Sequence, residues 1–204
     1  MNSTTAGPDG KLRCHWCHAT PEYLAYHDSE WGFPVTDDFR LFEKLSLEGF
    51  QSGLSWRTIL AKRENFRAAF HGFDFNRIAR FTERDVERLL QDAGIVRHRG
   101  KIEAVINNAR CAKELIKREG SLAAFIWRYE PARNSATPQT ASTSAESIAL
   151  SKELKKQGWK FVGPTTIYAF MQAMGLINDH AEGCVVRAKA ARARKSFTRP
   201  ASRV

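Results

Sequence analysis

Cysteine and histidine side chains gather near both ends of the 204-residue chain. Cys14 and Cys17 form a C-x-x-C pair, and His180 and Cys184 are four residues apart, a spacing that brings two ligands to one side of a helical turn. Thiolates and imidazoles in a tetrahedral set suit Zn²⁺, and four protein ligands leave no open position for catalysis. The C-x-x-C pair alone is weak support, because no second pair follows at zinc-finger spacing. The pattern therefore indicates a metal site but leaves Cys17 and His27 as competing ligands.

A turn between two apolar segments has residues that could bind a phosphate group. Gly163 precedes Pro164, Thr165 and Thr166, which open a new apolar helix. Proline fits the first turn of a helix, where its missing N–H is not needed, and the free N–H groups there bind anions such as a DNA phosphate. This is the layout of a helix-hairpin-helix, although a turn of this kind more often serves packing alone.

A similar segment, residues 89–109, carries a basic cluster beside its turn. Arg97, Arg99 and Lys101 lie there within five residues. As contacts to a DNA backbone they would give affinity without sequence preference. The alternative is an ordinary solvated face of the protein.

The elements that would position these groups are helical. Apolar residues recur every three or four positions in 39–50, 56–70, 83–90 and 101–119. Thr82 followed by Asp85 indicates a capped helix start. Residues 130–147 are rich in Ser, Thr, Ala and Pro and indicate a long surface loop, ended by Thr143 and Glu146 as the start of the next helix. Strand patterns are scarce, so the sequence predicts an all-α protein.

The net charge of +10 is unevenly distributed. Seven of the ten net charges fall in residues 187–204, which contain no acid and indicate a disordered basic tail, either an added phosphate-binding arm or a solubilising tail. No apolar run is long enough for a membrane span, and the first residues have no hydrophobic signal core. We therefore expect a cytoplasmic protein whose four cysteines are thiols or metal ligands rather than disulfides.

Several long motifs resemble one known family. They are CHW (14–16), YLAYHDSEWG (23–32), LEGFQSGLSW (47–56), KRENF (62–66), DAGIVRHRGKI (92–102), FVGPTT (161–166) and NDHAEGC (178–184). Together they span most of residues 12–184 and are similar to the bacterial 3-methyladenine DNA glycosylase I family.

The resemblance implies a helix-hairpin-helix DNA glycosylase fold with a zinc-bearing lobe formed by the N- and C-terminal segments. It implies a single helical domain over 12–186, so that 1–11 is a disordered extension and 187–204 the basic tail. It also resolves the choice of ligands, since the family pattern assigns one structural Zn²⁺ to Cys14, His27, His180 and Cys184.

The same resemblance implies a pocket for a damaged base. Methylation at N3 gives adenine a positive charge that weakens its bond to deoxyribose, and the base must be flipped out of the duplex to be reached. A flat cation favours aromatic faces and a buried carboxylate. Glu48, in the apolar run LSLEGF, would accept hydrogen bonds from the base, although without the resemblance it would be a helix-surface acid. Trp56 would stack, Tyr26 would supply a hydroxyl, and the walls would be Tyr23, Trp16 and Trp31.

The resemblance leaves the attacking water unassigned. Asp179 lies where related glycosylases carry a catalytic aspartate, yet it adjoins the expected ligand His180. No lysine follows the hairpin where relatives with lyase activity carry one, so we expect hydrolysis alone. The expected enzyme is a monomer that acts on double-stranded DNA containing alkylated adenine, near the bacterial nucleoid, and releases free 3-methyladenine. The alternative is a noncatalytic, zinc-stapled DNA-binding module of the same fold.

Overall fold

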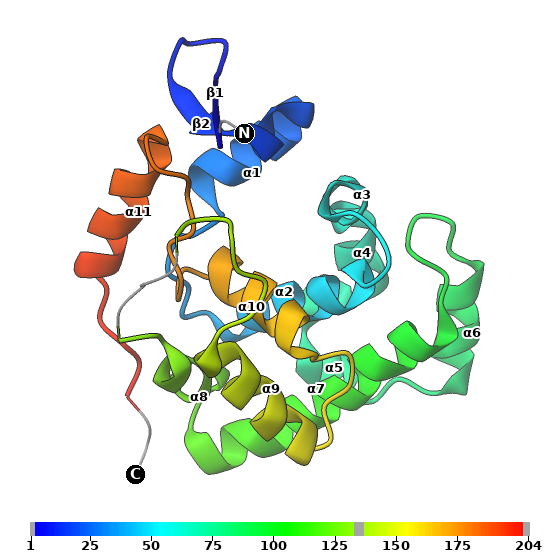
Figure 1. Ribbon diagram of the computed structural model, residues 1–204. Coiled ribbons are helices and arrows are strands. Elements are labelled where there is room, and N and C mark those ends of the chain that lie inside the picture. The colour runs from blue at the N-terminus through cyan, green and yellow to red at the C-terminus, as the bar shows by residue number, and fades with distance from the viewer. Residues whose placement is uncertain (1–2, 133–136, 202–204) are drawn as a thin grey trace.

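The structure of the protein, a computed structural model, describes residues 3–132 and 137–201. Within these residues the chain is helical apart from one short β-hairpin (Figure 1). In chain order the elements are β1 (Thr4–Ala6), β2 (Leu12–Cys14), η1 (His15–Ala19), α1 (Pro21–Ser29), α2 (Asp38–Gln51), α3 (Trp56–Ala61), α4 (Arg63–Ala69), η2 (His71–Phe73), α5 (Phe75–Ile78), α6 (Glu83–Gln91), α7 (Arg99–Glu119), α8 (Leu122–Ile126), η3 (Trp127–Tyr129), α9 (Ala145–Lys156), α10 (Pro164–Ala173) and α11 (Val185–Lys195).

Side-chain caps fix where many of these helices begin. The capping box expected at Thr82 is present, with Asp85 accepting from the Thr82 backbone N–H at 2.9 Å. The expected box at Thr143 is displaced by one residue, because Ser144 caps α9 and pairs reciprocally with Ser147. A serine does the work of Glu or Gln here, so the usual sequence signal of a capping box is missing.

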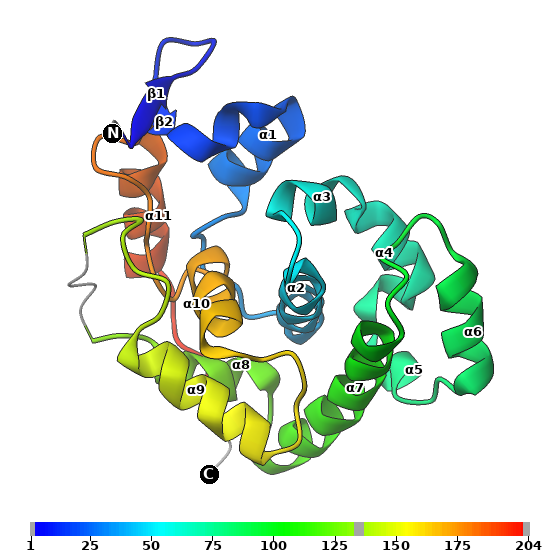
Figure 2. The same ribbon diagram turned by 45° about the vertical axis from the view of Figure 1, so that its right-hand side comes forward.

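Helix α2 lies at the centre of the molecule. Figure 2 shows it enclosed by α1, α3, α7, α8 and α10, and it packs most extensively on α10. Nine of its fourteen residues are buried, including every residue from Lys44 to Phe50, so this part of the helix has no solvent-facing side. A helix buried all round is normally apolar, but α2 also buries Lys44 and Glu48. These two charges in the core mark α2 as the helix that carries chemistry.

The N-terminal extension is ordered, so the expectation of disorder over 1–11 is wrong for residues 3–11. β1 and β2 form an antiparallel pair in which Thr4 is opposite Cys14. Arg13 ties this hairpin to α1, with its Nε 2.9 Å from an Asp28 oxygen. Three-residue strands are too short to produce a recognisable alternation of apolar and polar residues, so no sequence pattern indicated them.

The basic tail is also structured over much of its length. α11 extends to Lys195 and lies beside the β-hairpin, so the two chain ends meet (Figures 1 and 2). Farther on, the Phe197 ring packs 4.4 Å from that of Trp127. The expectation of a disordered tail is therefore wrong for 187–197, because small side chains such as Ala190 bury one face of α11 without an obvious apolar pattern. Residues 202–204 lie outside the described ranges.

The segment expected to hold phosphate is a helix–turn–helix formed by α9 and α10. Its turn uses two left-handed residues, Gly158 (φ 87°) and Phe161 (φ 56°). The Ser151 hydroxyl donates to the Val162 carbonyl at 2.6 Å, which fixes the turn against α9. Gly163 precedes the first residue of α10, as expected. α10 packs on α2, so the turn is held next to the central helix.

Candidate active site

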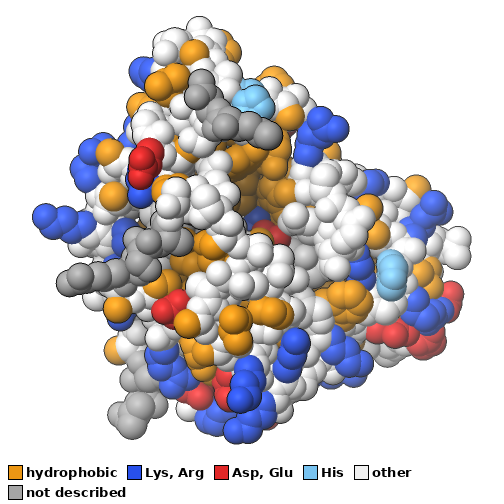
Figure 3. Space-filling model, viewed as in Figure 1, with side chains coloured by type: hydrophobic (Ala, Val, Ile, Leu, Met, Phe, Trp, Pro, Cys, Tyr) orange, Lys and Arg blue, Asp and Glu red, His pale blue; other side chains and the backbone are white. Residues whose placement is uncertain are grey.

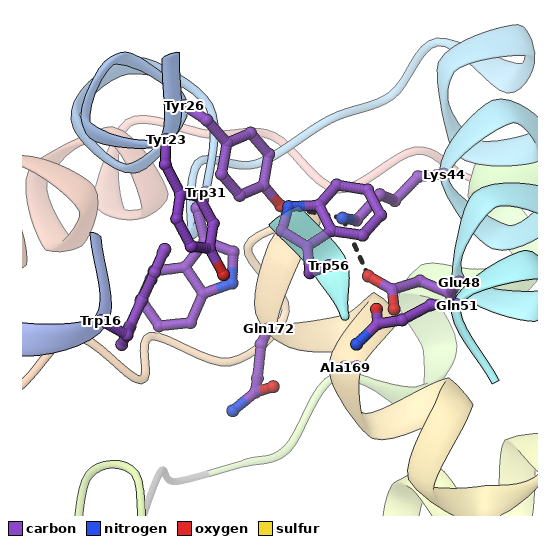
Figure 4. Close-up of a pocket in the computed structure, with 10 residues that line it drawn as sticks. All are labelled: Trp16, Tyr23, Tyr26, Trp31, Lys44, Glu48, Gln51, Trp56, Ala169 and Gln172. Atoms are coloured by element: carbon purple, nitrogen blue, oxygen red, sulfur yellow. Dashed lines mark hydrogen bonds and ion pairs between the residues drawn. The ribbon is translucent and has the colours of Figure 1, made fainter. Parts of the chain in front are cut away.

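A pocket of about 140 Å³ opens beside α2. An interior cavity of roughly 150 Å³ holds a benzene ring, so this space accepts a flat ring of modest size. Figure 3 shows the molecular face hollowed here, with hydrophobic side chains around the hollow. Figure 4 shows the lining: Trp16, Tyr23, Tyr26, Trp31, Lys44, Glu48, Gln51, Trp56, Ala169 and Gln172. We call this the aromatic pocket.

Local helix geometry explains how the lining converges. Tyr23 and Tyr26 are three residues apart on α1 and so share a face, as do Ala169 and Gln172 on α10. On α2 the lining residues follow at intervals of four and three, which is the period of one helix face. Trp56 is the first residue of α3, placed there by the Ser55 cap. Four helices (α1, α2, α3 and α10) and η1 therefore aim their side chains at one space.

The structure brings together all five aromatic residues expected at the base site. Trp16 packs 4.9 Å from Tyr23 and 4.9 Å from Trp31, centroid to centroid. On the opposite wall, the Tyr26 and Trp56 rings are 5.4 Å apart. The indole N–H of Trp56 is buried and has no hydrogen-bond partner. These rings supply broad faces for a planar guest, and electron-rich faces favour a cationic one.

Glu48 is buried in the pocket wall as the resemblance implied, with 5% of its surface exposed. Sequence reasoning missed its partner, Lys44, whose Nζ lies 2.8 Å from Glu48 Oε1 and 2.8 Å from the Tyr26 hydroxyl oxygen. Burial lowers the pKa of Lys44 to about 8, against the opposing effect of Glu48, and burial raises the pKa of Tyr26. The available signal was the position of Lys44 one helical turn before Glu48.

Asp179 does not line the pocket, contrary to the expectation of a catalytic position. It is 2% exposed and accepts hydrogen bonds from the Gln139 backbone at 2.9 Å and from Gln172 Nε2 at 2.5 Å. Burial raises the pKa of its carboxyl group. Asp179 therefore reaches the pocket only through Gln172, whose side chain lies in the lining.

Three of the four residues expected to bind metal bring their ligand atoms together where the chain ends meet, and the fourth, His180, lies beside them. One ligand atom from each of Cys14, His27 and Cys184 lies within 4.8 Å of the other two, and all three residues are buried. The His180 ring lies 5.0 Å from that of His27, and its Nε2 is buried without a hydrogen-bond partner. We call these four residues the cysteine–histidine cluster.

Each histidine of the cluster is oriented from behind. Asp28 Oδ1 lies 2.8 Å from His27 Nδ1, and Asn178 Oδ1 lies 2.9 Å from His180 Nδ1. Fixing Nδ1 in this way leaves Nε2 free to bind a metal, an arrangement typical of metal-ligating histidines. Hydrogen bonds from Cys14 and His27 lower the pKa of the Cys184 thiol, whereas the hydrogen bond with Cys184 raises the pKa of Cys14, so this pair favours one thiolate. The donor set fits Zn²⁺.

The cluster and the pocket share a wall. The rings of Trp16 and Trp31 lie 5.3 Å from His27 and 4.7 Å from His180, respectively. Gly32 has a φ of +82°, and a Cβ there would come 2.6 Å from His180 Cε1, so only glycine allows this close approach. The neighbouring residues Tyr26 and His27 thus serve the pocket and the cluster separately.

A groove of about 310 Å³ adjoins the aromatic pocket on the side of α10. Thr165 and Thr166 line it together with Ser52 and Leu54, and it shares Glu48 with the pocket. The free N–H groups at the start of α10 therefore lie next to the pocket mouth. This is where the sequence placed a phosphate site.

The basic cluster beside α7 does not form one surface. Lys101 is 7% exposed and its Nζ donates to the Phe50 carbonyl at 2.8 Å, so the expectation that it contacts DNA is wrong. It caps the end of α2, where carbonyls lack helical partners. Arg99 is ion-paired with Glu83, Glu87 and Glu103, which offset its charge. Arg97 is exposed, and no ion pair involves it among the described residues.

Comparisons with known proteins agree with this architecture. The family model for methyladenine glycosylase matches residues 16–188. DNA-3-methyladenine glycosylase 1 of Escherichia coli is 53% identical over 178 residues, covering 84% of this chain and 95% of the relative. The Haemophilus influenzae DNA-3-methyladenine glycosylase is 46% identical, with coverage of 84% and 96%.

Solved structures resemble the whole helical body. A crystal structure of 3-methyladenine DNA glycosylase I superposes with a TM-score of 0.80 at 51% identity, covering 85% of this chain and 98% of that one. The Staphylococcus aureus enzyme, described for its recognition of 3-methyladenine, gives 0.81 at 36% identity, with coverage of 86% and 96%. The fold is that of a helical DNA glycosylase, as expected. The chain belongs to the methyladenine glycosylase family.

No helix of the described ranges is both long and apolar enough to span a membrane.

Proposed function

We propose that the aromatic pocket receives 3-methyladenine flipped out of DNA. The protein is a DNA-3-methyladenine glycosylase, which hydrolyses the N-glycosyl bond and so excises this base in base excision repair. The observation that carries the assignment of the site is a buried carboxylate, Glu48, facing an aromatic space about the size of a small ring. Aromatic faces and an anion together favour a cationic base over a neutral one.

Each wall has a distinct part in this proposal. Trp56 stacks on the base, and Trp16, Tyr23 and Trp31 close the opposite side. Glu48 accepts a hydrogen bond from the exocyclic amino group, and the Tyr26 hydroxyl binds the same base. Because the methylated base already leaves readily as a neutral molecule, the enzyme needs recognition and orientation of the flipped nucleotide more than a strong acid.

Asp179, which lies outside the pocket lining, has a supporting part. Asp179 holds the Gln172 amide group by accepting a hydrogen bond from Nε2. The Gln172 side-chain oxygen is then left as an acceptor. We assign Asp179 to positioning Gln172 rather than to contact with the sugar.

The reaction stops at base release. Lys44 is the one lysine in the pocket lining, and its Nζ already binds Tyr26 and Glu48. No free amine is thus presented for a Schiff base with the sugar. Borohydride treatment during turnover is expected to trap no covalent protein–DNA adduct.

We propose that the cysteine–histidine cluster holds one structural Zn²⁺ through Cys14, His27, His180 and Cys184. The support is the close set of buried ligand atoms and the unpartnered His180 Nε2. Four protein ligands would leave the ion no open position, so its contribution is folding energy rather than chemistry. By fixing the His27 and His180 rings, the ion would hold the Trp16 and Trp31 walls of the pocket.

The duplex would lie along the groove beside α10, in a helix-hairpin-helix contact. Helix N-termini bind phosphates through free N–H groups, and Gly163, Thr165 and Thr166 occupy the first turn of α10 and its cap. Arg97, in the turn that precedes α7, would add a positive charge that contacts the DNA backbone. We further propose that the protein works as a monomer on the double-stranded DNA of the bacterial cytoplasm.

A base-release assay tests the function against its alternative. The full-length protein is incubated with methylated duplex DNA, the released bases are separated by chromatography, and DNA binding is measured in parallel. We expect free 3-methyladenine to appear in proportion to the enzyme. DNA binding without any base release would instead identify a noncatalytic DNA-binding module.

A further inference from the structure

A lysine in the wall of a pocket for a cationic base needs an explanation. Lys44 is 5% exposed and lies on α2, one turn before Glu48. Like charges repel, and burial of an ammonium is unfavourable without compensation. The proposed excision reaction assigns no role to Lys44.

The three donors of Lys44 have three neighbours. Its Nζ lies 2.8 Å from the Tyr26 hydroxyl oxygen, 2.8 Å from Glu48 Oε1, and 3.1 Å from the centroid of the Trp56 ring (Figure 4). An ammonium has three N–H donors and no acceptor. The direction of both hydrogen bonds is therefore fixed: the tyrosine oxygen and the carboxylate oxygen accept.

This direction sets what the two oxygens offer to a guest. A hydroxyl group has one proton, so a Tyr26 oxygen that accepts from Lys44 has its own proton left to donate into the pocket. Glu48 has Oε1 bound to Lys44 and keeps its second oxygen as an acceptor. Both bonds to Nζ measure 2.8 Å, so the two oxygens are less than twice that distance apart. The pocket thus presents a donor and an acceptor close together.

Adenine has the complementary edge. It carries an amino donor beside a ring-nitrogen acceptor, whereas guanine carries two acceptors, N7 and O6, on the corresponding edge. We propose that Lys44 is a positioning residue that selects for the adenine edge by fixing Tyr26 as a donor and Glu48 as an acceptor. The proposal rests on the function proposed above. A neutral amine at Lys44 could accept from Tyr26 and reverse that polarity, so the ammonium is required.

Binding of free bases to the full-length protein tests the proposal without DNA. The probes are 3-methyladenine and 3-methylguanine, and affinities are measured by calorimetry. We expect Lys44→Met to weaken 3-methyladenine binding tenfold or more and to narrow the preference over 3-methylguanine. In a Tyr26→Phe background the same substitution is expected to cause a several-fold smaller loss, because the hydroxyl it acts on is gone. An equal loss in both backgrounds, or no loss in either, overturns the proposal.

Lys62→Met is the matched control, because Lys62 also donates to two oxygen atoms, the carbonyls of Ala93 and Gly94, but lies outside the pocket. It should leave both affinities unchanged. If wild-type protein fails to bind 3-methyladenine at all, the proposed function fails, and not the part given to Lys44.

A second measurement needs no substitution at Lys44. Charged groups around its Nζ are Glu48 on α2, Glu30 at the end of α1 and Arg63 on α4, with the Tyr26 hydroxyl beside it. Above the lowered pKa of Lys44, about 8, 3-methyladenine binding should weaken in wild type more than in Tyr26→Phe. Titration of the free base affects both proteins equally and so cancels. Identical pH profiles would overturn the proposal even if Lys44→Met failed to fold.

Discussion

The cysteine–histidine cluster and the aromatic pocket are two buried polar assemblies on either side of α1. In the cluster, ligand atoms converge to within 4.8 Å, and the histidines are fixed from behind by Asp28 and Asn178. In the pocket, polar atoms and rings converge on an open space of about 140 Å³. The cluster suits a small ion that remains bound, and the pocket suits a base that binds and is released in each turnover. Substitutions should therefore change folding in one region and binding in the other.

Loss of a cluster ligand should give the largest effect. Cys184→Ala removes one of the four proposed ligands and leaves buried histidines without a metal. Because zinc binding contributes folding energy, we expect the free energy of unfolding to fall by several kcal/mol. Thermal unfolding, zinc content and base release are measured together, and activity should fall only with the folded fraction. A fully folded but inactive Cys184→Ala protein would require a catalytic metal.

Loss of the pocket carboxylate should strongly reduce activity while leaving the fold intact. In Glu48→Gln, an amide oxygen still accepts from Lys44, so the fold is expected to persist. The base would lose a charge-assisted hydrogen bond and would face the Lys44 cation without an anion. We expect base release to drop by two to three powers of ten, about 3–4 kcal/mol. Glu64→Gln, at an exposed carboxylate, is the control. Wild-type activity in Glu48→Gln would make the pocket assignment wrong.

The sequence specified these two regions unequally. The aromatic residues and Glu48 could be placed by motif resemblance, because each motif is a continuous run of the sequence. The partner of Glu48 was missed, because a lysine in a helix is normally a surface residue and only tertiary burial gives Lys44 its contacts. Spacing alone could not separate Cys17 from His27 as a ligand, because that choice depends on segments more than 150 residues apart.

The ends of the chain show the same limitation. The hairpin at 4–14 contacts helix α11, and Arg194 of α11 is ion-paired with Glu130. Local composition indicated disorder, because neither segment has an apolar periodicity of its own. Long-range contacts decided the outcome in both.

The buried lysine of the pocket should show itself in the pH dependence of stability. Burial lowers the pKa of Lys44 from 10.5 to about 8, so between these values the unfolded chain binds more protons than the native protein. The free energy of unfolding of wild type should therefore rise with pH relative to Lys44→Met, by at most roughly 3 kcal/mol. The destabilisation is fully present below pH 8 and disappears above 10.5. Urea unfolding of both proteins across this range checks the sign, and parallel curves would contradict it.

Arg13 supports the cluster from outside, and its loss should give the smallest effect of the set. Its Nη1 lies 2.6 Å from Asp9 in the hairpin and its Nε 2.9 Å from Asp28, which in turn fixes His27. Burial alone would raise the pKa of Asp28, but hydrogen bonds from His27 and Arg13 lower it, so this carboxyl stays ionised.

In Arg13→Met, Asp28 still bonds to His27, but Asp28 no longer has the hydrogen bond from Arg13 that holds it in place. We expect zinc affinity, measured by competition with a chromophoric chelator, to fall about tenfold, the lower end for a residue that orients a ligand. Base release by the zinc-loaded protein should be unchanged, because no pocket group contacts Arg13. Arg67→Met is matched to it, since Arg67 also bridges two acids, Glu43 and Glu64, but lies away from the cluster. Equal zinc affinities in the two variants would mean that the hairpin packs beside the cluster without supporting it. A loss of base release at full zinc occupancy would mean that the cysteine–histidine cluster and the aromatic pocket are not separable.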